Sequence, residues 1–328
     1  MKETLPRLGA ALLIAAATLV AATSASALTP ARVADLQASA RPAGVPLDYV
    51  VTPNGFFHAS CVIELADDDV VAPNGDIALA DGRTRKGTAC AFPSFDTDGH
   101  ARNSPVAADG QSIQPTINGW VVDSNYNTSS TPASSKMVAD FVVPSGPTSS
   151  AGQVLYFFPG LEALPNVQSI LQPVLAWDGF GDNAWTVTNW NCCINGTTYH
   201  GGSISTSTGH TVHSVMTGAK CASNGICPTW KIVATDNNSG QKTTFKTQAH
   251  GQAFNWYFGG VMEVYGVSTC SQYPSNGSIS FSNIHVYGVS GSESTPSTWS
   301  KSISNVTPSC SYGLTTTKNT AVISFSAH

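Results

Sequence analysis

Two polar residues interrupt segments whose side chains alternate as in buried β-strands. Gln172 is the only polar side chain in residues 170–177, and Glu263 stands alone among apolar neighbours on its face of residues 261–267. A buried amide or carboxylate needs a partner, and apolar surroundings raise the pKa of a carboxyl toward the range of a general acid or base. We therefore take Gln172 and Glu263 as candidate catalytic residues. The same pattern also fits a hydrogen-bonded strand residue or the floor of a binding face.

The pair could hydrolyse a peptide bond without a metal or an organic cofactor. Glu263 would take a proton from the attacking water, and the Gln172 amide would donate to the developing oxyanion. The protonated Glu263 would then give its proton to the leaving amine. Four aromatic residues near these segments are candidate substrate-binding residues, although such residues also form cores: Trp177, Trp185, Trp190 and Tyr265.

Strands, rather than helices, must position these residues. After residue 45, helix-length amphipathic segments are nearly absent, and short β-branched and aromatic runs alternate with Gly, Ser, Asn and Pro. Residues 118–290 are predicted to form an all-β, two-sheet antiparallel sandwich of the jelly-roll kind. The expected strands include residues 137–143, 153–158, 170–177, 185–191, 211–216, 230–235, 243–248, 260–267, 278–281 and 321–325.

The segments that flank this domain predict export. Residues 1–27 have a positive start, an apolar run and the small-residue site Ala25-Ser26-Ala27, as a secretory signal peptide does. The apolar run is shorter than the ~20 residues of a membrane span. Residues 28–117 are interpreted as an N-terminal prosegment or cap, and residues 291–328 as a Ser/Thr-rich C-terminal extension with one strand. We expect a secreted, extracellular protein without membrane attachment after cleavage.

The composition restricts the partners. Charged residues make up 11% of the chain, against about 25% in an ordinary soluble domain, and the formal net charge is −5. Residues 103–328 contain no arginine, seven lysines and nine acids. The absence of a basic stripe argues against a nucleic-acid partner. The uncharged polar composition fits a secreted protein suited to acid, and we expect a monomer that acts on polypeptide.

Eight cysteines, an even number in a chain predicted to be exported, indicate disulfides. The pairs expected from proximity in sequence are Cys61 with Cys90 and Cys221 with Cys227. Adjacent Cys192 and Cys193 would then pair with Cys270 and Cys310. A zinc site is disfavoured because no repeated Cys-x-x-Cys or matching histidine spacing occurs.

Residues 166–172, Asn-Val-Gln-Ser-Ile-Leu-Gln, resemble the strand that presents the catalytic glutamine in the eqolisin glutamic peptidases. Residues 261–264, Val-Met-Glu-Val, resemble the strand that presents their catalytic glutamate. Supporting pieces follow in the family's order: Gly119-Trp120, residues 138–144, Ala184-Trp185 with Trp190, residues 235–245 and Phe281-Ser282-Asn283. The resemblance spans roughly residues 119–290. It implies a concanavalin-like sandwich with Gln172 and Glu263 on its concave sheet and a secreted endopeptidase active at acid pH.

Other interpretations stay open. Residues 186–189, Thr-Val-Thr-Asn, replace an acid that the family carries between its tryptophans. The neprosin-type peptidases, which use two glutamates, are a more distant resemblance that Gln172 counts against. The alternative function is a non-catalytic or carbohydrate-directed, lectin-like sandwich. A glycosidase needs two acids across the substrate, whereas the other acids of this region mostly fall in expected turns: Glu162, Asp178, Asp182 and Asp236. A catalytic pair requires Gln172 and Glu263 to share one face of the sandwich.

Overall fold

The structure, a computed structural model, describes residues 41–102 except 73 and 88, and residues 117–328 except 129, 166, 168 and 193–195. The expected signal peptide, residues 1–27, lies outside the described residues. In the ranges that are described, no helix is both long and apolar enough to cross a membrane.

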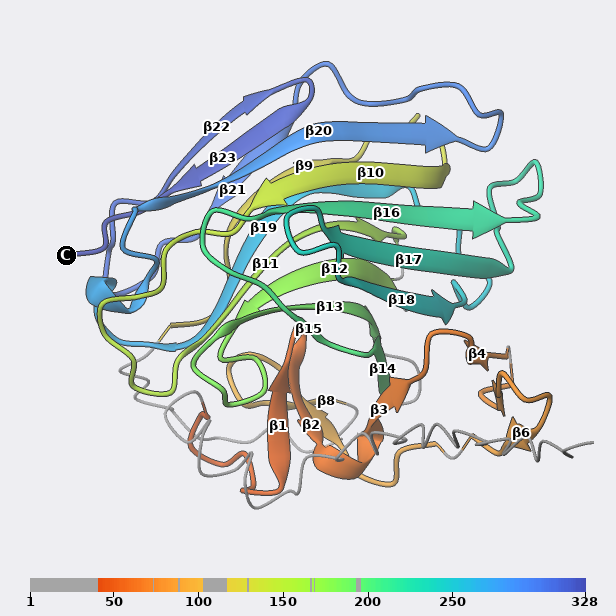
Figure 1. The fold of residues 1–328 in the computed structure, drawn as a ribbon, viewed down its shortest axis with the longest axis horizontal. Coiled ribbons are helices and arrows are strands. Elements are labelled where there is room, and N and C mark those ends of the chain that lie inside the picture. The colour runs from red at the N-terminus through yellow and green to blue at the C-terminus, as the bar shows by residue number, and fades with distance from the viewer. Residues whose placement is uncertain are drawn as a thin grey trace, which may run out of the picture.

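Two large β-sheets form the molecule (Figure 1). The first has the order β22 (Gly313–Thr317), β23 (Thr320–Ser324), β20 (Ser278–Gly288), β10 (Ser134–Val142), β16 (Thr211–Ala219), β17 (Thr229–Asp236), β18 (Lys242–Thr247), β4 (Val70–Val71), β5 (Ile77–Ala78) and β6 (Thr84–Arg85). The second has the order β21 (Ser300–Ile303), β9 (Ile117–Tyr126), β19 (Trp256–Val267), β11 (Val154–Glu162), β12 (Ile170–Trp177), β13 (Trp185–Cys192), β14 (Thr198–Gly201) and β3 (Val62–Leu65), with β15 (Ile204–Ser205) on β13.

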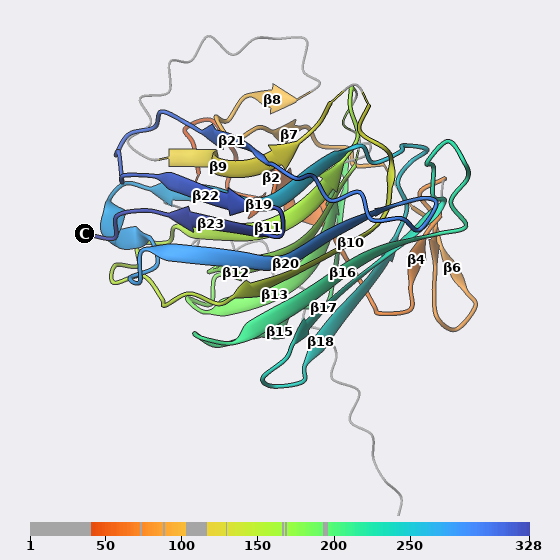
Figure 2. The same cartoon turned by 90° about the horizontal axis from the view of Figure 1, so that it is seen from above.

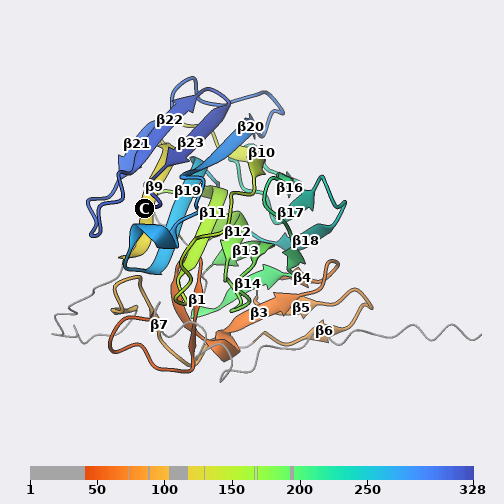
Figure 3. The ribbon, with the colours of Figure 1, turned by 60° about the vertical axis from the view of Figure 1, so that its left-hand side comes forward.

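A third, smaller sheet covers the second one. It has the order β1 (Tyr49–Thr52), β2 (Gly55–His58), β7 (Ser94–Phe95) and β8 (Ala101–Arg102). Figure 3 shows β1 and β7 on the opposite side of β11–β13 from β16 and β17. We call β1 and β2 with their connecting residues, 49–58, the hairpin.

Two apolar layers follow from this stacking. The larger core lies between the two large sheets and includes Leu171, Phe157, Met262, Phe245 and Phe281. The smaller lies between the second sheet and the hairpin, and includes Phe56. Alternate residues of β12 and β19 enter the two layers, because side chains alternate between the faces of a strand. Both faces of β12 and β19 are therefore apolar because each face is buried in one of the two layers.

The predicted all-β, two-sheet antiparallel sandwich is confirmed. Among the described residues of 118–290, every strand pairing is antiparallel. Two parallel pairings join N-terminal strands to the large sheets, β14 with β3 at the edge of the second sheet and β18 with β4 in the first. Both use strands from residues 62–71, so part of the N-terminal segment is built into the large sheets.

The C-terminal extension contributes three strands, and the expectation of one strand there is wrong. β21 pairs with β9, and the β22–β23 hairpin extends the first sheet beside β20 (Figure 2). β21 was missed because all four of its residues, Ser-Lys-Ser-Ile, are exposed. A strand at a solvated edge carries little apolar alternation.

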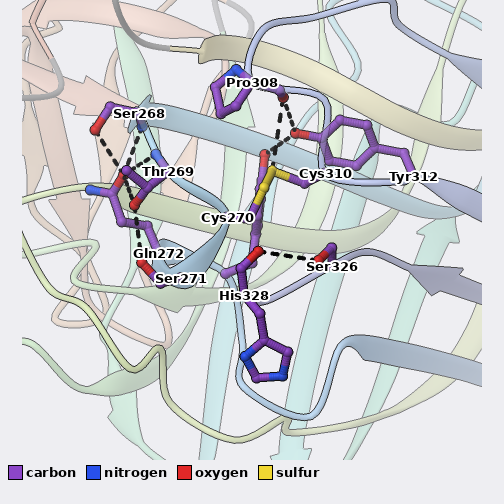
Figure 4. The surroundings of a disulfide bond; sticks show 11 residues. Ser268, Thr269, Cys270, Ser271, Gln272, Pro308, Cys310, Tyr312, Ser326 and His328 are labelled. Atoms are coloured by element: carbon purple, nitrogen blue, oxygen red, sulfur yellow. Dashed lines mark hydrogen bonds between the residues drawn. A yellow bond between two sulfur atoms is a disulfide. The ribbon is translucent and has the colours of Figure 1, made fainter.

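Three disulfides join pairs of cysteines within the described residues. The predicted Cys61–Cys90 and Cys221–Cys227 bonds are confirmed. Cys270 and Cys310 pair with each other and tie the C-terminal tail to the residues after β19 (Figure 4), so their predicted pairing with Cys192 and Cys193 is wrong. Cys192 is itself disulfide-bonded, and Cys193 lies outside the described residues. β13, which carries Cys192, lies three strands from β19. That is about 14 Å, beyond the reach of a disulfide.

Candidate active site

Gln172 and Glu263 point to the same face of the second sheet. They lie on β12 and β19, the two neighbours of β11. Residues two positions before and after each belong to the apolar layer beneath the hairpin. The intervening Leu171 and Met262 belong to the core between the large sheets. Each polar side chain therefore shares a face with the residues two positions away on its strand, as alternation predicts, and this face lies opposite the main core.

One residue of the hairpin contacts both members of the pair. The backbone N–H of Asn54 donates to Glu263 Oε1 at 3.0 Å, and Asn54 Nδ2 donates to Gln172 Oε1 at 3.1 Å. Because a single side chain and its own N–H reach both groups, Gln172 and Glu263 lie together beneath the tip of the hairpin. The fold thus joins two residues that are far apart in the sequence.

The Asn54-Gly55 turn gives the hairpin tip its shape. Both residues have positive φ values, 125° and 110°, in a region that glycine enters freely and other residues rarely adopt. A Cβ on Gly55 would lie 2.3 Å from the carbonyl oxygen of Phe95 on β7. Thr52 Oγ1 donates to the Gly55 carbonyl across the turn. Close packing of β2 on β7 therefore requires glycine at position 55.

Burial dominates the electrostatics of Glu263. Its side chain is inaccessible to solvent, and this burial raises the pKa of Glu263 to about 7. Hydrogen bonds from Tyr265 and Asn54 oppose the rise, as do the nearby Trp120 side chain and the charge of Arg102. The strongest visible contact is from Tyr265 Oη, which donates to Glu263 Oε1 at 2.6 Å. The carboxyl is therefore poised to exchange a proton near neutral pH.

Two polar atoms of the pair have no hydrogen-bond partner among the described residues. They are Glu263 Oε2, an acceptor, and Gln172 Nε2, a donor. An unpaired polar atom this deeply buried is costly in a protein interior. One acceptor to activate water and one donor to bind an oxyanion are the two functions that metal-free peptide hydrolysis requires.

Aromatic side chains frame the pair. Trp120 on β9 and Tyr156 on β11 lie directly across from Glu263 in the strand register. Tyr156 Oη donates to the carbonyl of Val51 in the hairpin at 3.3 Å. The ring of Phe56 meets the Tyr265 ring edge-on, with 5.4 Å between their centroids. The hairpin therefore rests on an aromatic surface around the carboxyl.

The predicted substrate-binding residues divide between the two faces. Trp190 lies across from Gln172 on β13, and Tyr265 contacts Glu263. Trp177 and Trp185 pack instead against the core between the large sheets, with their rings 5.3 Å apart. Trp177 is five residues after Gln172, and an odd separation places it on the opposite face of the strand. The structure thus brings Trp190 and Tyr265 to the site and keeps Trp177 and Trp185 away from it.

Other residues of this face were not predicted. Asn54 and Tyr156 carry no sequence signal for the site, because their role arises from the docking of the hairpin. Glu162, expected in a turn, ends β11 instead, and burial together with the charges of Glu263 and Asp123 raises its pKa to about 8. The strand continues through the Pro-Gly pair at residues 159 and 160, where its pairing with β19 shifts register.

Possible metal ligands gather in one place among the described residues. The ligand atoms of Asp96, Asp98 and His100 lie within 4.8 Å of one another in the turn between β7 and β8. Asp96 Oδ1 accepts the N–H groups of Asp98 and His100, so turn formation accounts for this cluster. Asp178 and Asp182, which the sequence analysis expected in turns, occupy a turn in which Asp178 accepts the N–H of Asn183.

Comparisons with known proteins give structural neighbours only. No protein-family model matches the chain, and no curated protein does. Scytalido-glutamic peptidase, solved with a peptide-based transition state analog, is similar at 13% identity and a TM-score of 0.46, over 64% of this chain and 99% of that one. SCP-B, an eqolisin solved with the tripeptide Ala-Ile-His, is similar at 14% identity and a TM-score of 0.44, with the same coverage. Lectin II from Ulex europaeus is similar at 12% identity and a TM-score of 0.27, over 54% of this chain and 83% of that one.

Proposed function

We propose that this protein is a secreted peptidase in which Glu263 and Gln172 hydrolyse a peptide bond. The observation that carries the proposal is the convergence of these two residues, from separate strands, on one buried face beneath Asn54. The raised pKa of Glu263 and the unpartnered Oε2 and Nε2 atoms support an active pair rather than a structural one. The resemblance of residues 166–172 and 261–264 to the eqolisin strands supports the same assignment.

The reaction would proceed through a tetrahedral intermediate. Glu263 Oε2 takes a proton from water as the water oxygen bonds to the scissile carbonyl carbon. Gln172 Nε2 donates a hydrogen bond to the resulting oxyanion. Collapse of the intermediate breaks the carbon–nitrogen bond, and Glu263 returns its proton to the leaving amine. The carboxylate is then restored, and the products are an acid and an amine.

The proposed acid optimum follows from the environment of Glu263. Burial is the largest cause of its raised pKa, while Tyr265, Asn54 and Trp120 favour the charged form. With the hairpin displaced and the site open to water, Glu263 would be more hydrated than it is beneath the hairpin. The pKa of Glu263 would then fall toward the ordinary range of a carboxyl, near 4. Both the charged and the protonated forms would therefore be available in mild acid.

The decisive experiment replaces Glu263 by glutamine, which keeps the shape and removes the base. We expect Glu263→Gln to lower cleavage of a denatured protein substrate by at least about 10³-fold. Glu293→Gln, at a half-exposed ion pair with Lys318, is the matched control and should keep full activity. Products are identified by mass spectrometry between pH 3 and 7, on protein both with and without prior incubation in acid. Full activity in Glu263→Gln would reject the mechanism, and absence of cleavage by the unmodified chain under all these conditions would favour the lectin-like alternative.

A further inference from the structure

We infer that the hairpin, residues 49–58, is a built-in inhibitor that occupies the place of substrate over Gln172 and Glu263 and must lift before a polypeptide can bind. This inference rests on the proposed function. It assigns the N-terminal segment a role that its composition alone did not define, because a removed prosegment and a retained cap were both consistent with the sequence.

The contacts of the hairpin leave no access to the pair. The side chains of Gln172, Glu263 and Phe56 are all fully buried. Asn54 uses its N–H on the carboxylate and its side-chain amide on the glutamine, the two groups that a substrate peptide must reach. Tyr156 Oη donates to the carbonyl of Val51, three residues before Asn54 in the hairpin. A peptide cannot approach the pair while the tip of the hairpin is in place.

The tip also contacts one oxygen of each member of the pair with donor groups of the kind that a polypeptide ligand carries. A backbone N–H and a primary amide are the donor groups that peptides carry, and both are aimed at the site. The contact therefore places polypeptide donors on the Oε1 atoms of the pair, beside the Oε2 and Nε2 atoms that the proposed reaction uses, whereas an ordinary core would meet these strands with apolar side chains alone. Phe56 adds an aromatic anchor against Tyr265.

The hairpin is attached differently from the rest of the N-terminal segment. β3 and β4 form backbone ladders with β14 and β18 of the large sheets. The hairpin pairs along its backbone only with β7 in the described residues, within the separate four-stranded sheet. It meets the second large sheet through its tip and its side chains. The four-stranded sheet can therefore lift without breaking a ladder of either large sheet.

A disulfide defines the base of this movable layer. Cys61, at the end of the 3₁₀ turn η2 (Ala59–Cys61) that follows the hairpin, is bonded to Cys90, which precedes β7. The bond joins the point where the chain leaves the hairpin, just before β3 begins, to the segment that leads back into the four-stranded sheet at β7. The layer is thus hinged at one end and closed at the Asn54 end.

The test opens the tip without unfolding the sandwich. Asn54→Gly removes the amide contact to Gln172, and glycine adopts the positive φ of this position freely. Phe56→Ala removes the anchor on Tyr265. Asn74→Gly is the matched control, because Asn74 also precedes a glycine in a turn of the N-terminal segment but contacts Asp76 instead of the pair. We expect about tenfold faster peptide hydrolysis for Asn54→Gly and more for Phe56→Ala, since apparent affinity scales with the open fraction. Asn74→Gly should match the unmodified chain.

A second measurement reports the hairpin independently of activity. Hydrogen exchange of residues 49–58 should accelerate in both tip variants while residues 154–158 on β11 keep their protection. A synthetic peptide with the sequence of residues 49–58 should inhibit Phe56→Ala competitively. Faster exchange without any hydrolysis in any variant would support a removable cover but reject the peptidase. Equal hydrolysis by the unmodified chain and both variants would reject the inhibitor and leave the peptidase standing. Slower hydrolysis in Asn54→Gly would place Asn54 in the catalytic machinery and also reject the inhibitor.

Discussion

Two buried carboxyls of this sandwich, Asp236 and Glu263, have pKa values that are shifted in opposite directions. Neither side chain is accessible to solvent. Asp236 ends β17 in the first large sheet, and its pKa is held well below the usual range. Glu263 lies within β19 of the second sheet, and its pKa is raised to about 7. Burial alone therefore does not identify a carboxyl that can exchange protons.

The difference lies in the number of donors. Burial acts to raise the pKa of Asp236, but hydrogen bonds from His210, Thr206 and the N–H groups of Ser239 and Asn238 outweigh it. Both of its oxygens are used: Oδ2 accepts from His210 and Thr206, and Oδ1 accepts the two N–H groups. A carboxylate that accepts this many hydrogen bonds is fixed in its charged form. Asp236 therefore stabilises the turn between β17 and β18.

Glu263 has a smaller set of donors, concentrated on one oxygen. Tyr265 and the N–H of Asn54 share Oε1, while Oε2 has no partner among the described residues. One of these two donors belongs to the hairpin and departs with it. The comparison suggests that an incomplete donor set, combined with burial, distinguishes a reactive carboxyl from a structural one.

The largest further effect is expected at Gln172, the other half of the pair. Gln172→Ala removes the oxyanion donor, and we expect kcat to fall about 10²–10³-fold with little change in folding. The measurement is steady-state cleavage of a fluorogenic peptide by Gln172→Ala and Glu263→Gln, compared in the Phe56→Ala background. That background makes the comparison independent of how tightly the hairpin closes.

Gln153 provides the matched control for this change. It is equally buried, but its amide donates to the carbonyls of Ser149 and Gln272. Gln153→Ala should lower the melting temperature and leave kcat nearly unchanged. Equal losses of kcat in the two variants would mean that Gln172 acts only through stability.

A smaller effect, on stability rather than on rate, is expected at Asp236. Asp236→Asn turns an acceptor into a donor facing His210, Thr206 or backbone N–H groups, which should cost about 1–3 kcal/mol of unfolding free energy. That corresponds to a fall in Tm of several degrees. The stabilisation from the lowered pKa of Asp236 is present above the unfolded pKa, near 4, and is lost as pH falls through the lower folded value. Differential scanning calorimetry at pH 6 measures the loss, and a variant as stable as the original chain would contradict the structural role.

The sequence and the structure agree where alternation controls the outcome. The all-β sandwich and two local disulfides were predictable, because each follows from side-chain periodicity or from short separations, whereas the shared face of Gln172 and Glu263 was expected from the resemblance of their strands to those of the eqolisin peptidases. The hairpin cover, the Cys270–Cys310 bond and the β21 edge strand were not predictable, because they depend on which layers and edges meet in space. Trp177 was expected to bind substrate, although alternation places it on the face of the strand opposite to Gln172. We expected the Trp177 ring to bind substrate because it is aromatic and close to Gln172 in the sequence, whereas it packs against the core between the large sheets.

The smallest effect is expected at Glu162, a third buried carboxyl that can be compared with Asp236 and Glu263. Burial and the charges of Glu263 and Asp123 raise its pKa to about 8, as expected of a donor-poor group like Glu263 and unlike Asp236. Between the unfolded pKa, near 4.5, and about 8, the folded chain holds a proton that the unfolded chain releases. The contribution of Glu162 to the free energy of unfolding is therefore greatest below pH 4.5 and is lost as pH rises through 8.

Glu162→Gln replaces this carboxyl by a neutral group at every pH. The variant should unfold at nearly the same temperature as the original chain at pH 4 and a few degrees higher at pH 9, because the cost of charging Glu162 disappears. Thermal unfolding followed by circular dichroism at the two pH values measures the difference, to which the lost repulsion between Glu162 and the charges of Glu263 and Asp123 contributes in the same direction. Glu293→Gln serves as the opposite control, since Thr295, Lys318 and His285 lower the pKa of Glu293 to about 2. A gain for Glu162→Gln that is equal at pH 4 and pH 9 would show that its packing, rather than its charge, sets the effect, and would remove Glu162 from the donor-poor class.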